Sequence, residues 1–127
     1  MGPAFADHAA YLAALPEDVQ PVLREILARV QALIPGARPC ISYRMPAFRA
    51  GPGQGRVFFY AAAFKRHVGV YPPVADDAAL VAELAPWRNE KGNLAFPLNR
   101  PMPLNLIDRV ALALHAQYVS VPSEGPS

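Results

Sequence analysis

Two lysines stand out among the basic residues of this chain. Lysine occurs only at positions 65 and 91, and the other Lys and Arg residues among the 12 are arginines. Each lysine lies at the boundary of an expected strand, close to aromatic residues and glycine. An ammonium group is a compact donor that reaches a carboxylate, phosphate or carbonyl group without the planar fork of arginine. Chance placement of two scarce residues is the alternative, and composition leaves both interpretations open.

His67 is the histidine with the most favourable neighbours. It opens an expected strand two residues after Lys65, and strand alternation places it on the same face as Tyr71, with Gly69 between them. An imidazole in this position could act as a general base, with Lys65 as electrostatic support. The alternative is a half-buried structural histidine at a strand edge. His8 and His115 lie in expected helices without a second ligand at metal-binding spacing, so the residues predict no metal site.

Aromatic side chains gather in the expected strands, where the sheet core is their usual place. Phenol groups need a polar partner when they are buried, so the tyrosines are the aromatic residues expected to reach a cavity or a lysine. A concave apolar pocket with a few polar groups is typical of small-ligand sites. The predicted ligand-binding residues are Tyr43, Phe48, Tyr60, Lys65, His67, Tyr71, Lys91 and Phe96.

The charge and the cysteine content restrict the class of protein. A formal net charge of +2, with basic residues scattered along 127 positions, argues against a nucleic-acid or anionic-membrane partner. The single cysteine, Cys40, excludes an internal disulfide and favours a reducing compartment. The longest apolar run, 57–64, is far shorter than the ~20 residues that span a bilayer. We therefore expect a soluble cytoplasmic protein.

Hydrophobic spacing and proline positions predict the elements that hold these residues. Steps of three and four predict helices over 19–34 and 104–118, with shorter helices at 5–15 and 76–84. Strands are expected over 39–50, as two segments around a bend at Met45-Pro46, and over 56–64, 67–71 and 93–98. The order predicts a single α+β domain over 1–118, with an antiparallel sheet and the N- and C-terminal helices packed on one face. Residues 119–127 are expected to form a flexible tail.

Four separated motifs suggest a known group of proteins. They are Ile41-Ser42-Tyr43-Arg44-Met45-Pro46-Ala47-Phe48, Phe59-Tyr60-Ala61-Ala62-Ala63-Phe64-Lys65-Arg66-His67-Val68-Gly69-Val70-Tyr71-Pro72, Lys91-Gly92-Asn93-Leu94-Ala95-Phe96-Pro97-Leu98 and Pro101-Met102-Pro103. In this order they resemble the YdhG-like family of small bacterial proteins. Arg44 stands where that family commonly has glycine, which places a cation near the expected cleft.

The resemblance implies a compact α+β fold and a function that is largely uncharacterised across the family. Some members are described as frataxin-like intracellular iron chaperones, so iron is the cofactor that the resemblance brings into consideration. Iron delivery by such a surface relies on clustered carboxylates. The first helices of this chain offer only Asp7, Glu17, Asp18 and Glu25.

Three hypotheses follow from these observations. The first is a non-enzymatic binding domain whose Lys/His/aromatic cleft takes a small anionic or polar ligand or a protein partner. The second is a frataxin-like iron-binding chaperone, which the family description favours. The third is an enzyme that uses His67 as general base.

Overall fold

A computed structural model describes residues 5–119 of the protein. The element bounds follow the predicted ranges to within a few residues. The helices are α1 (His8–Ala13), α2 (Gln20–Leu33), α3 (Ala78–Leu84) and α4 (Leu104–Tyr118), with a short 3₁₀ turn at Ala85–Trp87. The strands are β1 (Arg38–Ser42), β2 (Met45–Ala50), β3 (Arg56–Ala63), β4 (His67–Tyr71) and β5 (Leu94–Pro97). The predicted tail lies, from residue 120 onward, outside the described residues.

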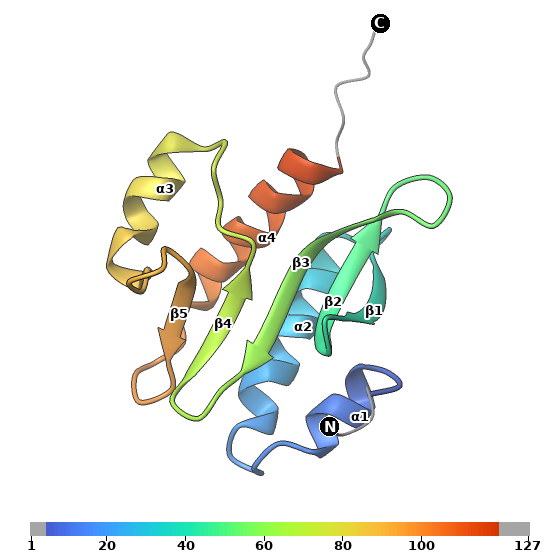
Figure 1. Cartoon of the computed structure of the whole chain (residues 1–127), viewed down its shortest axis with the longest axis vertical. Helices are drawn as coiled ribbons and strands as arrows, with labels where there is room; N and C mark the ends of the chain where they lie inside the picture. The colour runs from blue at the N-terminus through green and yellow to red at the C-terminus, as the bar shows by residue number, and fades with distance from the viewer. Residues whose placement is uncertain (1–4, 120–127) are drawn as a thin grey trace, which may run out of the picture.

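The five strands form one antiparallel sheet in the order β1-β2-β3-β4-β5 (Figure 1). Each strand pairs with the next one along the chain, because a short turn returns the backbone beside the strand it has just left. Only the connection from β4 to β5 contains a helix, α3. The predicted α+β class and antiparallel sheet are confirmed.

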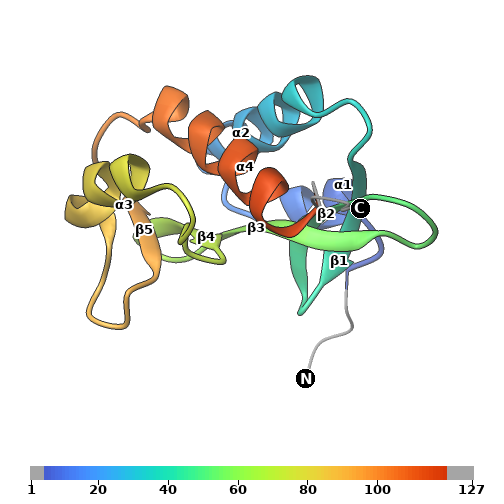
Figure 2. The same cartoon turned by 90° about the horizontal axis from the view of Figure 1, so that it is seen from above.

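The long helices α2 and α4 cover one face of the sheet (Figure 2). The apolar stripe of α2 and the matching stripe of α4 are buried there, which explains why their sequences repeat at helical spacing. On their outer sides, the Arg29 guanidinium donates to the Asp108 carboxylate at 2.7 Å and joins the two helices. The opposite face of β3 and β4 carries no helix within residues 5–119 (Figure 2).

Strand alternation separates the two faces of the sheet. Val68 pairs with Phe96 and Val70 with Leu94, and all four side chains are fully buried on the helix-covered side. The intervening residues, His67 with Pro97 and Gly69 with Ala95, pair on the side without helices. The segment after the β3–β4 turn therefore displays a histidine and a glycine on the open face.

A register shift allows two consecutive phenylalanines to be buried. Phe48 pairs with Phe59, but the next residue, Arg49, pairs with Val57, so Phe58 is an extra residue in β3. Such a bulge changes the alternation of side chains along the strand. Phe58 and Phe59 both have no exposed surface, and Phe58 packs edge-on against His115 of α4.

The bend between the first two strands differs from the prediction. The chain turns at Tyr43-Arg44, and Met45 and Pro46 already belong to β2. Tyr43 and Arg44 have φ values of 50° and 63°, as a two-residue hairpin turn of this hand requires. The predicted bend at Met45-Pro46 is wrong, because the turn residues Tyr43 and Arg44, and not the proline, set where the chain reverses.

Within residues 5–119, no helix is both long and apolar enough to cross a membrane.

Candidate functional site

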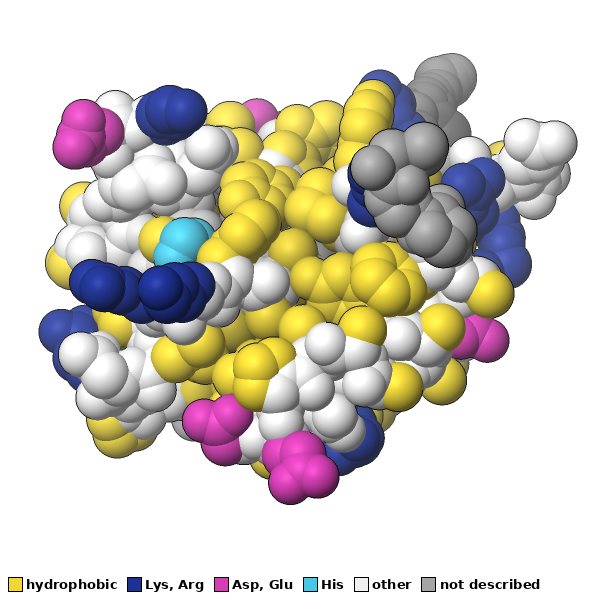
Figure 3. Space-filling view, turned by 60° about the horizontal axis from the view of Figure 1, so that its bottom comes forward, with side chains coloured by type: hydrophobic (Ala, Val, Ile, Leu, Met, Phe, Trp, Pro, Cys, Tyr) yellow, Lys and Arg dark blue, Asp and Glu magenta, His cyan; other side chains and the backbone are white. Residues whose placement is uncertain are grey.

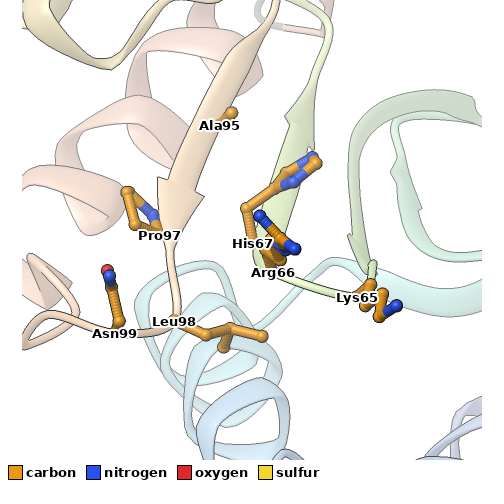
Figure 4. Close-up of a pocket in the computed structure, with 7 residues that line it drawn as sticks. All are labelled: Lys65, Arg66, His67, Ala95, Pro97, Leu98 and Asn99. Atoms are coloured by element: carbon orange, nitrogen blue, oxygen red, sulfur yellow. The ribbon is translucent and has the colours of Figure 1, made fainter.

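A surface hollow of about 660 Å³ lies where the β3–β4 turn meets the end of β5 (Figure 4). This volume is within the range of small-molecule sites, about 300–1,000 Å³. The residues that line the hollow are Lys65, Arg66, His67, Ala95, Pro97, Leu98 and Asn99. They come from two segments that are about thirty residues apart in the sequence.

Two backbone hydrogen bonds hold these segments together. The Phe64 amide donates to the His67 carbonyl at 2.8 Å and closes the β3–β4 turn. The Leu98 amide donates to the Arg66 carbonyl at 2.9 Å, directly after the His67–Pro97 pair of the sheet. The turn and the residues that follow β5 therefore form one continuous rim.

The His67 ring is held away from β5 by an aromatic partner. It stacks on Phe64 with ring centroids 5.0 Å apart and an interplanar angle of 25°. Figure 4 shows the imidazole pointing away from Pro97. A second, smaller hollow of about 290 Å³ is lined by Phe64, Leu15 and Val19 among others.

A small side chain forms the floor of the hollow, since Ala95 lines it with a single methyl group. Gly69, its partner across the strands, is covered by the Tyr71 ring. Pro97 and Leu98 supply an apolar wall, and Asn99 supplies an amide. The cavity thus combines an apolar floor and wall with polar groups on its rim.

The charge at the rim is positive. Lys65 and Arg66 are exposed, His67 is half-buried, and no aspartate or glutamate is among the lining residues. Within residues 5–119 the ion pairs join Arg29 to Glu25 and Asp108, and Arg109 to Glu83, so neither Lys65 nor Arg66 takes part in one. Cationic donors of this kind make strong, charge-assisted hydrogen bonds to carboxylate or phosphate oxygens.

The structure brings together only some of the residues predicted to bind a ligand. Lys65 and His67 both line the hollow. Lys91 precedes β5, whereas the hollow lies at the other end of that strand, where Pro97 pairs with His67. The expectation that both lysines converge is therefore corrected, because β5 runs from one lysine toward the other and separates them.

Phe48 and Phe96 are core residues, which also corrects the predicted cleft. Their exposed fractions are 1% and 0%, and Phe96 packs against Trp87 with ring centroids 5.3 Å apart. Strand alternation directs them to the helix-covered face, opposite to the side that carries His67. Sequence spacing identified them as aromatic strand residues but did not decide which face they occupy.

The three tyrosines belong to the open side of the sheet. Tyr43, at the hairpin turn, is 82% exposed, and its ring lies 5.9 Å from that of Tyr60. Tyr60 pairs across the strands with Tyr71, whose ring lies over Gly69. Figure 3, turned so that the bottom of Figure 1 comes forward, shows a broad apolar surface with a histidine and basic side chains next to each other at its margin.

Five lining residues were missed by sequence reasoning: Arg66, Ala95, Pro97, Leu98 and Asn99. Arg66 carried a signal, because Lys65-Arg66 is the only adjacent basic pair in the chain. The others became recognisable only once β5 was paired with β4, since that pairing places the residues after β5 beside the turn.

Potential metal ligands are dispersed in the part of the chain that the structure describes. No group of three His, Cys, Asp or Glu side chains there could hold a metal ion together. Several of these residues have structural partners. The Asp7 carboxylate accepts from the Ala10 amide at the start of α1, and His8 Nε2 donates to the Cys40 and Ala47 carbonyls at 3.0 and 2.9 Å.

Fold and site together define a small α+β protein with a meandering five-stranded sheet and a cation-rimmed hollow at one strand end. Among solved structures, the fold is similar to that of YdhG, a DUF1801-family protein from Bacillus subtilis. The TM-score is 0.71 at 18% sequence identity, over 86% of this chain and 87% of that one. This is the fold that the YdhG-like motifs predicted. No family model and no curated protein matches the sequence.

Proposed function

We propose that this protein is a divergent YdhG-like binding domain that takes a small organic anion in the hollow between the β3–β4 turn and β5. The observation that carries the proposal is the run Lys65-Arg66-His67 on the rim of a cavity that has no acidic lining residue. Two exposed cations supply the attraction for a carboxylate or phosphate group. The apolar wall of Pro97 and Leu98 supports a ligand with a short hydrocarbon body beside the anionic group.

The local architecture supports binding rather than a chance cluster of charge. The rim is fixed by hydrogen bonds of the Phe64 and Leu98 amides, and the imidazole is fixed by its stack on Phe64. A site formed in advance loses less conformational entropy when the ligand binds. The small side chain of Ala95 leaves room for the ligand body.

Titration with hexanoate, followed by amide NMR at constant ionic strength, tests the proposal. We expect saturable shifts confined to residues 64–67 and 95–99. The double variant Lys65→Gln/Arg66→Gln should bind at least tenfold more weakly, because each charge-assisted hydrogen bond contributes about 1.5–3 kcal/mol. Inorganic phosphate serves as the second probe, since it carries charge without a hydrocarbon body.

A matched control removes two positive charges elsewhere. Arg24 and Lys91 are exposed and lie away from the hollow, so Arg24→Gln/Lys91→Gln makes the same change in net charge. This variant should bind hexanoate as the original protein does. Equal weakening in both double variants would attribute binding to net charge and would contradict the proposed site.

A further inference from the structure

The position of the Tyr71 ring suggests a second recognition point at the edge of the same hollow. A Cβ atom built on Gly69 would lie 2.6 Å from the Tyr71 hydroxyl oxygen and 2.9 Å from the ring carbon that bears it. The phenol therefore folds back along its own strand and rests on the backbone of Gly69. Only glycine leaves this place free, because any side chain at position 69 would occupy it.

This arrangement places the hydroxyl group beside the hollow, next to its lining residue Ala95, although Tyr71 is not itself a lining residue. Gly69 pairs directly with Ala95, which lines the hollow, and His67 and Pro97 form the next pair on the same face. Two residues along a strand span about 7 Å. The Tyr71 hydroxyl and the cationic rim thus lie at opposite ends of a short stretch of the sheet surface that includes Ala95.

The Tyr71 hydroxyl is available to a ligand. Among residues 5–119, the Tyr71 hydroxyl has no hydrogen-bond partner. The tyrosine hydroxyl that does is that of Tyr11, which accepts from the Ala63 amide at 3.1 Å. A phenol both donates and accepts, so it suits a hydroxyl, a carbonyl or a carboxylate oxygen of a ligand. It carries no charge that would repel an anion.

We infer that the hollow selects organic acids that carry a second polar group about 7 Å from their anionic group, and that Tyr71 reads this second group. The inference rests on the proposed function. The anionic group lies at Lys65 and Arg66, the hydrocarbon body lies over Ala95 beside Leu98, and the distal oxygen reaches the Tyr71 hydroxyl. Gly69 is the positioning residue, since it determines where the phenol rests.

The test compares two acids of the same length, hexanoate and 6-hydroxyhexanoate, which differ only in the distal hydroxyl group. Amide NMR titration of the original protein should give three- to tenfold tighter binding of the hydroxy acid, the effect of about one net hydrogen bond. Tyr71→Phe should remove this preference and leave hexanoate affinity unchanged. Gly69→Ala should also remove it, because the added methyl group displaces the ring.

The possible outcomes separate this inference from the proposed function. If neither acid gives saturable shifts, the anion site itself is absent and both ideas fail. If both acids bind with equal affinity, or if Tyr71→Phe keeps the preference, the anion site stands and the role of Tyr71 is contradicted. Tyr60→Phe is the matched control, since Tyr60 lies across the strands from Tyr71 and not on Gly69, and it should keep the preference. Tyr71→Phe retains the ring, so the result does not depend on whether Gly69→Ala folds.

Discussion

The hairpin turn at Tyr43-Arg44 places two side chains in a backbone conformation that L-residues seldom adopt. Both φ values are positive, at 50° and 63°, and neither residue is glycine. Such residues cost about 1–3 kcal/mol each in backbone strain. Glycine is the residue that this geometry favours.

We expect Arg44→Gly to stabilise the protein by about 1 kcal/mol, because relief of strain exceeds the entropy that glycine adds to the unfolded chain. The midpoint of thermal unfolding should rise by about 4 °C. The control is Arg44→Ala, which removes the same charge but keeps a Cβ atom, and it should give no such gain. Equal stabilisation by both variants would show that removal of the Arg44 charge causes the gain, and would contradict relief of backbone strain as its cause.

The contact between α3 and α4 is a bidentate ion pair at the surface. The two terminal nitrogens of the Arg109 guanidinium, Nη1 and Nη2, donate to the Glu83 carboxylate at 2.8 and 2.7 Å. Hydrogen bonding to Arg109 lowers the pKa of Glu83 below its usual value of 4.5, against the smaller opposing effect of burial. The folded state therefore binds the Glu83 proton less readily than the unfolded chain does.

This pair predicts a pH-dependent difference between the original protein and Glu83→Gln. Above pH 4.5 the pair stabilises the original protein, and the difference should decline as the pH falls through the lowered pKa of Glu83. The effect should be small, because both side chains are about half exposed. Urea unfolding between pH 7 and pH 3 measures it, and Glu90→Gln, at an exposed position, is the control. A difference that grows toward low pH would contradict this assignment.

The aromatic residues fall into two groups. Those in the core contribute to stability, and those on the open face of the sheet lie at the surface. Phe96 has no exposed surface, whereas Tyr43 is 82% exposed. Phe96→Ala should cost about 3–5 kcal/mol of unfolding free energy, a large part of the roughly 5–15 kcal/mol available to a domain. Tyr43→Ala should cost less than about 1 kcal/mol. Chemical denaturation measures both, and similar losses would contradict the assignment of Phe96 to the core.

Local patterns predicted most of the architecture. Helical spacing located α2 and α4, and proline and glycine positions marked the ends of nearly every element. These signals act between residues that are close in the chain. The alternation of His67, Gly69 and Tyr71 against Val68 and Val70 was correct for the same reason. Lys65 and His67 were found as candidates because they are adjacent to one turn.

Long-range pairing decided the composition of the site. The pairing of β4 with β5 brought Leu98 and Asn99 to the β3–β4 turn and took Lys91 to the far end of β5, and no short-range pattern encodes that register. Packing of α2 and α4 on one face selected which aromatic residues became core, so Phe48 and Phe96 left the predicted cleft. The Tyr71 ring lies over Gly69, a contact between side chain and backbone that strand alternation allowed but did not specify.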